Sequence, residues 1–237
     1  MIGGTWQTTV PDRSPSLAVP QTAAALVVLP VFLQAPWVRL HPFTATLFTI
    51  VLLTVGLNLQ LNSRGMRAEI GSLLVGFSGS WLAGCLFWGW LRAHPLLHLP
   101  IEAFALPLAV TGLNSRWRLA CGFYLSSLLG TACTDLMMLA TGVMPFWPQV
   151  VSAPLHEAGL QLHYAANQLM KPQSLILLAS AASGILLTAR LLRQRTPADP
   201  DVQDVSGMAA SVLTTTLWVD GLFLAAALLQ PGLSGLI

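Results

Sequence analysis

Long apolar segments with almost no charge constrain this chain more than any other feature. Residues 43–61 and 70–91 contain no acidic or basic side chain at all. A helix needs about 20 mostly apolar residues to cross the hydrocarbon core of a bilayer. Only 8% of the chain is charged, compared with about 25% in soluble domains. The sequence therefore predicts an all-α, polytopic membrane protein with the lipid bilayer as its solvent.

The apolar segments divide the chain into a polar lead at 1–16, one membrane domain at 17–229 and a short tail at 230–237. Each segment is bounded by prolines, glycines or charged residues. We expect seven spans, at about 17–37, 43–61, 70–91, 98–113, 119–141, 173–192 and 207–229.

The long connection between the fifth and sixth spans, residues 142–171, contains one further periodic segment. Apolar residues recur there at helical spacing, as at Leu155, Ala158, Leu162 and Leu169. We expect a helix at about 155–170 that lies on the membrane surface.

Positive charges are distributed unequally between the two sets of loops that these spans predict. Eight of the 11 Lys and Arg residues fall on one side, and three, Arg39, Arg92 and Lys171, fall on the other. Short loops rich in Lys and Arg stay in the cytoplasm. This bias predicts a cytoplasmic N-terminus and a lumenal or periplasmic C-terminus. The net charge of +2 gives no indication of nucleic-acid binding.

Only three carboxylates, Glu102, Asp135 and Asp220, fall inside the predicted spans. With the helical rise of 1.5 Å, they lie roughly 6, 9 and 13 Å inside the non-cytoplasmic boundary. His98 precedes Glu102 by four residues, so the two share a helix face. A charge within the bilayer is costly and usually faces a partner or a cavity.

Two interpretations of this convergence stay open. The polar groups could neutralise one another and hold the helices together, or they could line a cavity that moves protons, binds a cation or performs acid–base chemistry. On the second interpretation Glu102, Asp135, Asp220 and His98 are the candidate catalytic residues. The candidate ligand-binding residues are Arg92, His94 and Trp90 at the same membrane edge, together with His156 and His163 on the surface helix. This helix would cover the cluster.

Other site chemistries have weaker support. His98 with Glu102 and His156 with His163 have spacings that could each supply two metal ligands, but a site needs three or four and no His-Glu-x-x-His or Cys-x-x-Cys motif occurs. We therefore expect no metal, and no cofactor can be assigned. Gln34 and Asn58 inside spans are expected to form hydrogen bonds between helices. Small residues at four-residue intervals, such as Gly76-Ser80-Gly84 and Gly122-Ser126-Gly130, favour close helix packing within the chain, with a homodimer face as the alternative.

Several sequence blocks are specific enough to indicate a family. They include residues 30–39, residues 76–92, Leu96-Leu97-His98-Leu99-Pro100-Ile101-Glu102, residues 123–135 and residues 219–223. Together they resemble a family of integral membrane proteins restricted to cyanobacteria, domain of unknown function 3120. The resemblance covers about 26–228 and implies a thylakoid or plasma-membrane location. It implies no activity and assigns no residue a role.

Three classes of function remain. The first is binding of, or acid–base chemistry on, an apolar ligand such as an isoprenoid, pigment or quinone. The second is an assembly or scaffold factor for a photosynthetic complex. The third is a proton- or cation-coupled carrier. The first is the leading interpretation, and whether the protein is an enzyme stays open.

Overall fold

The computed structural model describes residues 18–194 and 200–229, without the side chains of residues 155–156 and 200–203. Within these residues all regular structure is helical, which confirms the predicted all-α class. Seven segments are long and apolar enough to cross a membrane: Ala18–Leu40, Pro42–Asn62, Met66–Leu91, Pro95–Gly112, Arg118–Ala140, Pro172–Gln194 and Asp204–Leu229.

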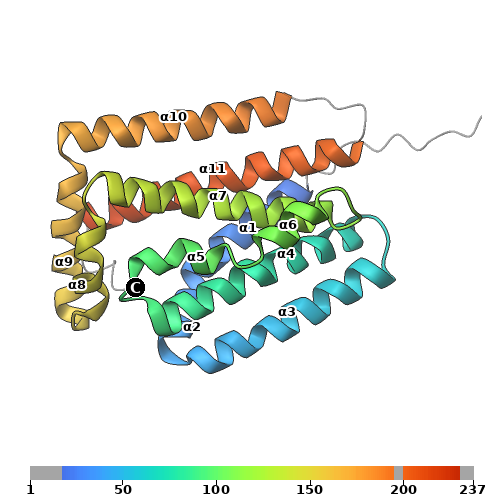
Figure 1. The fold of residues 1–237 in the computed structure, drawn as a ribbon, viewed down its shortest axis with the longest axis horizontal. Coiled ribbons are helices and arrows are strands. Elements are labelled where there is room, and N and C mark those ends of the chain that lie inside the picture. Colours follow the sequence, from blue (N-terminus) through green and yellow to red (C-terminus); the bar gives the residue numbers. More distant parts are fainter. Residues whose placement is uncertain (1–17, 195–199, 230–237) are drawn as a thin grey trace, which may run out of the picture.

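The long helices run side by side along one axis, and two short helices cross one end (Figure 1). The long helices are α3 (Pro42–Asn62), α4 (Met66–Leu86), α7 (Arg118–Ala140), α10 (Pro172–Gln194) and α11 (Pro200–Leu229). The crossing helices are α8 (Trp147–Ser152) and α9 (Leu155–Leu169), and α9 occupies the segment predicted as a surface helix. We call this end of the bundle the α9 end.

The first span stays helical through its prolines by widening one turn. It consists of α1 (Ala18–Leu29), a π-helical turn (Pro30–Gln34) and α2 (Ala35–Leu40). A proline cannot donate a backbone hydrogen bond, and a π turn is one way in which a helix absorbs that loss. The third span ends in a similar π turn, Phe87–Leu91.

The fourth span is broken in two, although the sequence predicts a single segment at 98–113. After a 3₁₀ turn (Pro95–Leu97) come α5 (His98–Glu102) and α6 (Leu106–Gly112). Pro107 lacks the N–H that a continuous helix would direct at the carbonyl of residue 103. The helix therefore ends before this proline.

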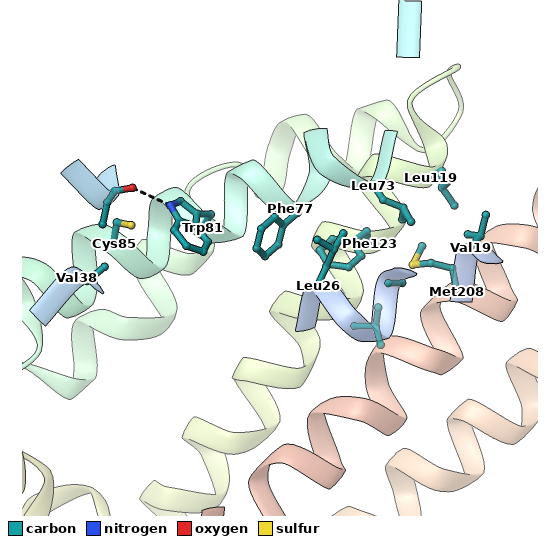
Figure 2. Packing of buried hydrophobic residues seen from close by; sticks show 13 residues of the cluster. Val19, Leu26, Val38, Leu73, Phe77, Trp81, Cys85, Leu119, Phe123 and Met208 are labelled. Atoms are coloured by element: carbon teal, nitrogen blue, oxygen red, sulfur yellow. Dashed lines mark hydrogen bonds between the residues drawn. The ribbon is translucent and has the colours of Figure 1, made fainter. Parts of the chain in front are cut away.

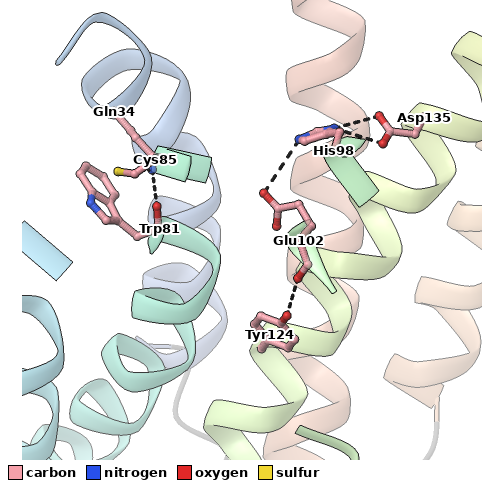
Figure 3. Close-up of polar contacts among 7 residues, drawn as sticks. All are labelled: Gln34, Trp81, Cys85, His98, Glu102, Tyr124 and Asp135. Atoms are coloured by element: carbon pink, nitrogen blue, oxygen red, sulfur yellow. Dashed lines mark hydrogen bonds and ion pairs between the residues drawn. The ribbon is translucent and has the colours of Figure 1, made fainter. Parts of the chain in front are cut away.

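A tyrosine from α7 satisfies the backbone groups that the break exposes. The Tyr124 hydroxyl accepts a hydrogen bond from the Ala105 N–H at 3.1 Å and donates one to the Glu102 carbonyl (Figure 3). Irregular backbone at membrane depth requires such internal partners. Tyr124 thus fixes the backbone of Glu102.

The main hydrophobic core is built around α4. Its aromatic residues Phe77 and Trp81 pack edge to face at 5.7 Å, and Phe123 of α7 meets Phe77 at 6.3 Å (Figure 2). The Trp81 indole N–H donates to the Ala45 carbonyl at 2.9 Å. By contrast, α10 buries only Ser174 and Ala189, so it lies at the edge of the bundle.

Glycines in the predicted small-residue rows allow close approach within the chain. A Cβ at Gly76 would collide with the Ala120 carbonyl of α7. A Cβ at Gly130 would lie 3.0 Å from Thr216 of α11. At both positions the row of small residues packs against another helix of the same chain, as the first of the two predicted alternatives requires.

Candidate functional site

A histidine joins two carboxylates where the fourth span breaks. His98 begins α5, and its Nδ1 atom lies 3.0 and 3.1 Å from the two carboxylate oxygens of Asp135 on α7. Its Nε2 atom lies 3.9 Å from Oε1 of Glu102, one turn further along (Figure 3). When Asp135 is ionised, Nδ1 must carry the hydrogen, which leaves the lone pair of a neutral imidazole on Nε2, towards Glu102.

Glu102 is almost fully buried, with 7% of its surface exposed. At 3.9 Å the contact between Oε1 of Glu102 and Nε2 of His98 is too long for a hydrogen bond, and it is an ion pair only when the imidazole is protonated. The imidazole itself is held by aromatic rings: it stacks on Phe87 at 4.2 Å and meets Trp88 edge-on at 6.4 Å. The carboxyl group of Glu102 is therefore weakly held, whereas the His98 ring is fixed by Asp135 and Phe87.

Asp220 joins the same group through α7. The Thr134 hydroxyl donates to Oδ2 of Asp220 at 2.6 Å, and Thr134 is adjacent to Asp135 in the chain. The connection between Asp220 and Asp135 is therefore the stretch of α7 that carries both Thr134 and Asp135. We call Glu102, His98, Asp135 and Asp220 the His98 cluster; it extends from α5 across α7 to α11.

The basic residues and the tryptophan expected at this site lie outside the cluster. Arg92 makes no ion pair with a carboxylate in the described part of the chain, and His94 is exposed. Trp90 is exposed and packs edge-on against Phe43 at 5.4 Å. Within the described residues, His98 is thus the basic member of the cluster.

The segment after the fifth span contacts the end of the third span through Trp147, which the sequence analysis did not place at the site. His163 of α9 lies 3.1 Å from the Ala227 carbonyl of α11, away from the cluster, and the side chain of His156 lies outside the described residues. Instead, Trp147 at the start of α8 packs on Trp88 at 5.4 Å and donates its indole N–H to the Arg92 carbonyl at 2.9 Å. His163 thus contacts α11, and the interpretation of α9 as a lid over the cluster stays a prediction.

Three partners of the cluster were missed at the sequence level: Phe87, Thr134 and Tyr124. Tyr124 had a detectable signal, because a tyrosine inside a span needs a partner for its hydroxyl. Thr134 stands in the same four-residue row as Gly130, where only its small size seemed relevant. Phe87 carries no pattern that separates it from other core residues.

A second buried polar site is neutral. The Gln34 side-chain amide, 3% exposed, donates to the Trp81 carbonyl at 2.6 Å and to the Cys85 sulfur at 3.1 Å (Figure 3). Gln34 therefore connects the first and third spans as expected, whereas Asn58 is exposed on α3. No group of three potential metal ligands occurs among the described residues.

Seven helices that are long and apolar enough to cross a membrane define an all-α integral membrane protein. The chain belongs to the family described as protein of unknown function DUF3120, whose model matches residues 23–228. No curated protein and no solved structure matches the chain.

Proposed function

We propose that this protein is a proton-handling membrane protein in which the His98 cluster takes up and releases protons inside the bundle. One observation carries the proposal: the His98 imidazole lies between the carboxylates of Glu102 and Asp135. Histidine changes its charge near neutral pH and can exchange protons at both ring nitrogens. Chains of Asp, Glu and His within membrane spans are typical of proton relays.

The geometry supports a definite proton path. A protonated Glu102 can transfer its proton to Nε2 of His98 once its side chain turns to close the 3.9 Å gap, while Nδ1 releases its hydrogen to Asp135. The imidazole then ends neutral in the other tautomer, so a rotation of the ring or the reverse transfer restores it. Residues positioned near the transferred proton, as Asp135 is at 3.0 Å, make such steps fast.

The positive-inside bias supports placing the cluster in the lumenal or periplasmic half of the membrane. The cluster lies towards the α9 end, and on this assignment the α9 end faces the lumen or periplasm and the N-terminus is cytoplasmic. A cyanobacterial thylakoid or plasma membrane is the location that the sequence resemblance implies.

Such a relay would serve a membrane-soluble ligand, either by acid–base chemistry on it or by proton-coupled transport. An apolar groove of about 310 Å³ lies between α7 and α10, and no residue of the His98 cluster lines it. Isoprenoids, pigments and quinones are neutral candidates. An assembly role in a photosynthetic complex is the competing proposal, and it would require no proton exchange.

Neutral isosteres of the cluster residues test the proposal. Glu102→Gln and Asp135→Asn keep the shape of each side chain but cannot exchange a proton. We expect both variants of the purified protein to lack one protonated-carboxyl band in pH-jump infrared difference spectra. In cells deleted for the gene, both should accumulate normally but fail to restore the pigment and quinone profile of the membranes.

Gln34→Leu is the matched control, because it changes a buried polar group outside the cluster. It should leave the infrared difference spectrum unchanged. If Glu102→Gln and Asp135→Asn both gave wild-type spectra and full complementation, the cluster would be structural. That result would favour the scaffold role.

A further inference from the structure

The His98 ring lies against aromatic side chains at the end of the third span. Phe87 and Trp88 are consecutive residues at the start of the π turn, and their ring centres lie 4.2 and 6.4 Å from that of the imidazole. The two rings also pack edge to face on each other at 5.4 Å, and Trp147 packs on Trp88 from α8. Phe87 is only 1% exposed, so it cannot move aside without disturbing this aromatic group. Phe87 therefore forms a fixed surface beneath the imidazole.

This surface opposes reorientation of the His98 ring. The planes of the imidazole and of Phe87 meet at 33°, which is closer to face-to-face than to edge-on packing. If the imidazole turns about its bond to Cβ, it passes through a position in which one ring edge points at Phe87. With 4.2 Å between ring centres, the edge atoms would then come closer than the about 3.5 Å at which two carbon atoms make good contact. The torsion itself has broad preferences, so packing sets the barrier.

The contacts at the two ring nitrogens differ in the same sense. Nδ1 lies 3.0 and 3.1 Å from the two oxygens of Asp135, and this hydrogen bond would break if the ring turned (Figure 3). Oε1 of Glu102 lies 3.9 Å from Nε2 and has to move before a proton can pass. In the described part of the chain, Glu102 and Asp135 are the ionisable side chains that contact the ring. The carboxyl group of Glu102 is therefore the moving part of the relay, and the ring is the fixed part.

The orientation of the ring decides in which direction protons can move. After one transfer Glu102 is ionised, Asp135 is protonated and the imidazole carries its hydrogen on Nε2. A second transfer in the same direction needs a hydrogen on Nδ1 again. Either the ring exchanges the positions of its two nitrogens, which requires it to turn about its side-chain bonds, or the first proton returns. If the ring cannot turn, only the return remains.

We propose that Phe87 is a positioning residue of the His98 cluster, which prevents the imidazole from reorienting so that a proton passed from Glu102 to Asp135 returns by the same route. The cluster then stores one proton between two carboxyl groups and does not conduct protons in one direction. The balance is closed, because Asp135 gains one proton when Glu102 loses one, and the reverse step restores both. The inference rests on the proposed function, because it specifies how that relay operates.

Solid-state NMR of the full chain in lipid bilayers, with isotope-labelled histidine, measures the motion of the ring. The carbon–hydrogen dipolar couplings of an imidazole decrease when the ring jumps between orientations. We expect an order parameter of about 0.85 for the His98 ring in the wild type, as in a rigid group, and a value below about 0.6 in Phe87→Ala. The His98 signal is identified by its loss in His98→Gln.

Three further variants separate positioning from simple packing. Phe87→Leu fills much of the same volume without a flat face and should mobilise the His98 ring, whereas Phe87→Tyr retains the flat face and should keep it rigid. The leucine variant also provides the test if Phe87→Ala does not fold. Phe43→Ala is the matched control, because Phe43 packs on Trp90 of the same π turn at 5.4 Å. It should leave the order parameter of His98 unchanged.

A mobile His98 ring in the wild type would overturn the inference, as would a rigid ring in both Phe87→Ala and Phe87→Leu. A proton leak into wild-type liposomes that His98→Gln abolishes would also overturn it, because such a leak requires net passage through the ring. Failure of the relay itself is a separate result. It would appear as wild-type infrared spectra of Glu102→Gln and Asp135→Asn, whether or not the ring is rigid.

Discussion

Two buried polar sites in this bundle differ in how they are held. Gln34 is neutral, lies against Gly84 and forms a 2.6 Å hydrogen bond to the Trp81 carbonyl inside an aromatic core. Glu102 is ionisable, equally deep, and its closest charged partner is 3.9 Å away. The first arrangement stabilises the contact between two spans. The second arrangement leaves the Glu102 carboxyl group weakly held beside the fixed imidazole of His98.

The Gln34 site has the features of a packing contact, whereas the Glu102 site has the features of an acid–base site. A neutral amide needs only one good partner, and a glycine opposite it provides the space. The His98 cluster instead places the ionisable groups Glu102 and Asp135 on the two ring nitrogens of one imidazole. We therefore expect changes around Gln34 to affect stability and changes in the His98 cluster to affect proton exchange.

The largest effect should come from the packing region. Gly76→Ala places a Cβ against the Ala120 carbonyl, so α4 and α7 must separate. We expect a loss of about 3 kcal/mol or more in the free energy of unfolding, measured by reversible unfolding in mixed micelles. Gly184→Ala is the control and should unfold like the wild type, because its Cβ meets open space. Equal stability of the two variants would contradict the close contact between α4 and α7.

Tyr124→Phe should affect both regions. It removes the hydroxyl that pairs the Ala105 N–H and the Glu102 carbonyl, and leaves two backbone groups unpaired. The expected cost is about 1–3 kcal/mol in the same unfolding assay. Because the Glu102 backbone loosens, the infrared band of the buried carboxyl should also broaden. A stability loss with an unchanged band would mean that Tyr124 supports the fold alone.

Gln34→Leu sharpens the contrast with Glu102→Gln. Loss of the hydrogen bond between spans should reduce stability by about 1 kcal/mol. The pH-jump infrared difference spectrum should be unchanged in the Gln34 variant and altered in the Glu102 variant, whose stability should be near that of the wild type. A changed spectrum in Gln34→Leu and an unchanged one in Glu102→Gln would contradict the assignment of proton exchange to the His98 cluster.

The smallest effect is expected at the α9 end. Trp147→Phe keeps an aromatic ring next to Trp88 but loses the hydrogen bond to the Arg92 carbonyl. We expect a loss of about 0.5 kcal/mol together with faster hydrogen–deuterium exchange in residues 92–97. Trp90→Phe at an exposed position should change neither quantity.

The seven spans could be predicted because membrane crossing depends on length and composition, which the apolar runs display directly. The proximity of His98, Glu102 and Asp135 could also be predicted, from their spacing and common depth. The rotation of each helix could not, because α4, α7 and α11 are apolar on all sides and carry no periodic face. For this reason Trp90, rather than its neighbour Trp88, was expected at the site, although Trp88 is the one that lies near His98.

The broken fourth span also affects the lipid around it. It has 18 residues, which cover about 27 Å at the helical rise, whereas the 26 residues of the third span cover about 39 Å. The hydrocarbon core is about 30 Å thick, so this part of the protein creates a local hydrophobic mismatch. The apolar side chains of Phe104 and Leu108 are exposed on this span. We expect the adjacent leaflets to thin there, which brings bulk water closer to His98 and shortens the distance that a proton must travel.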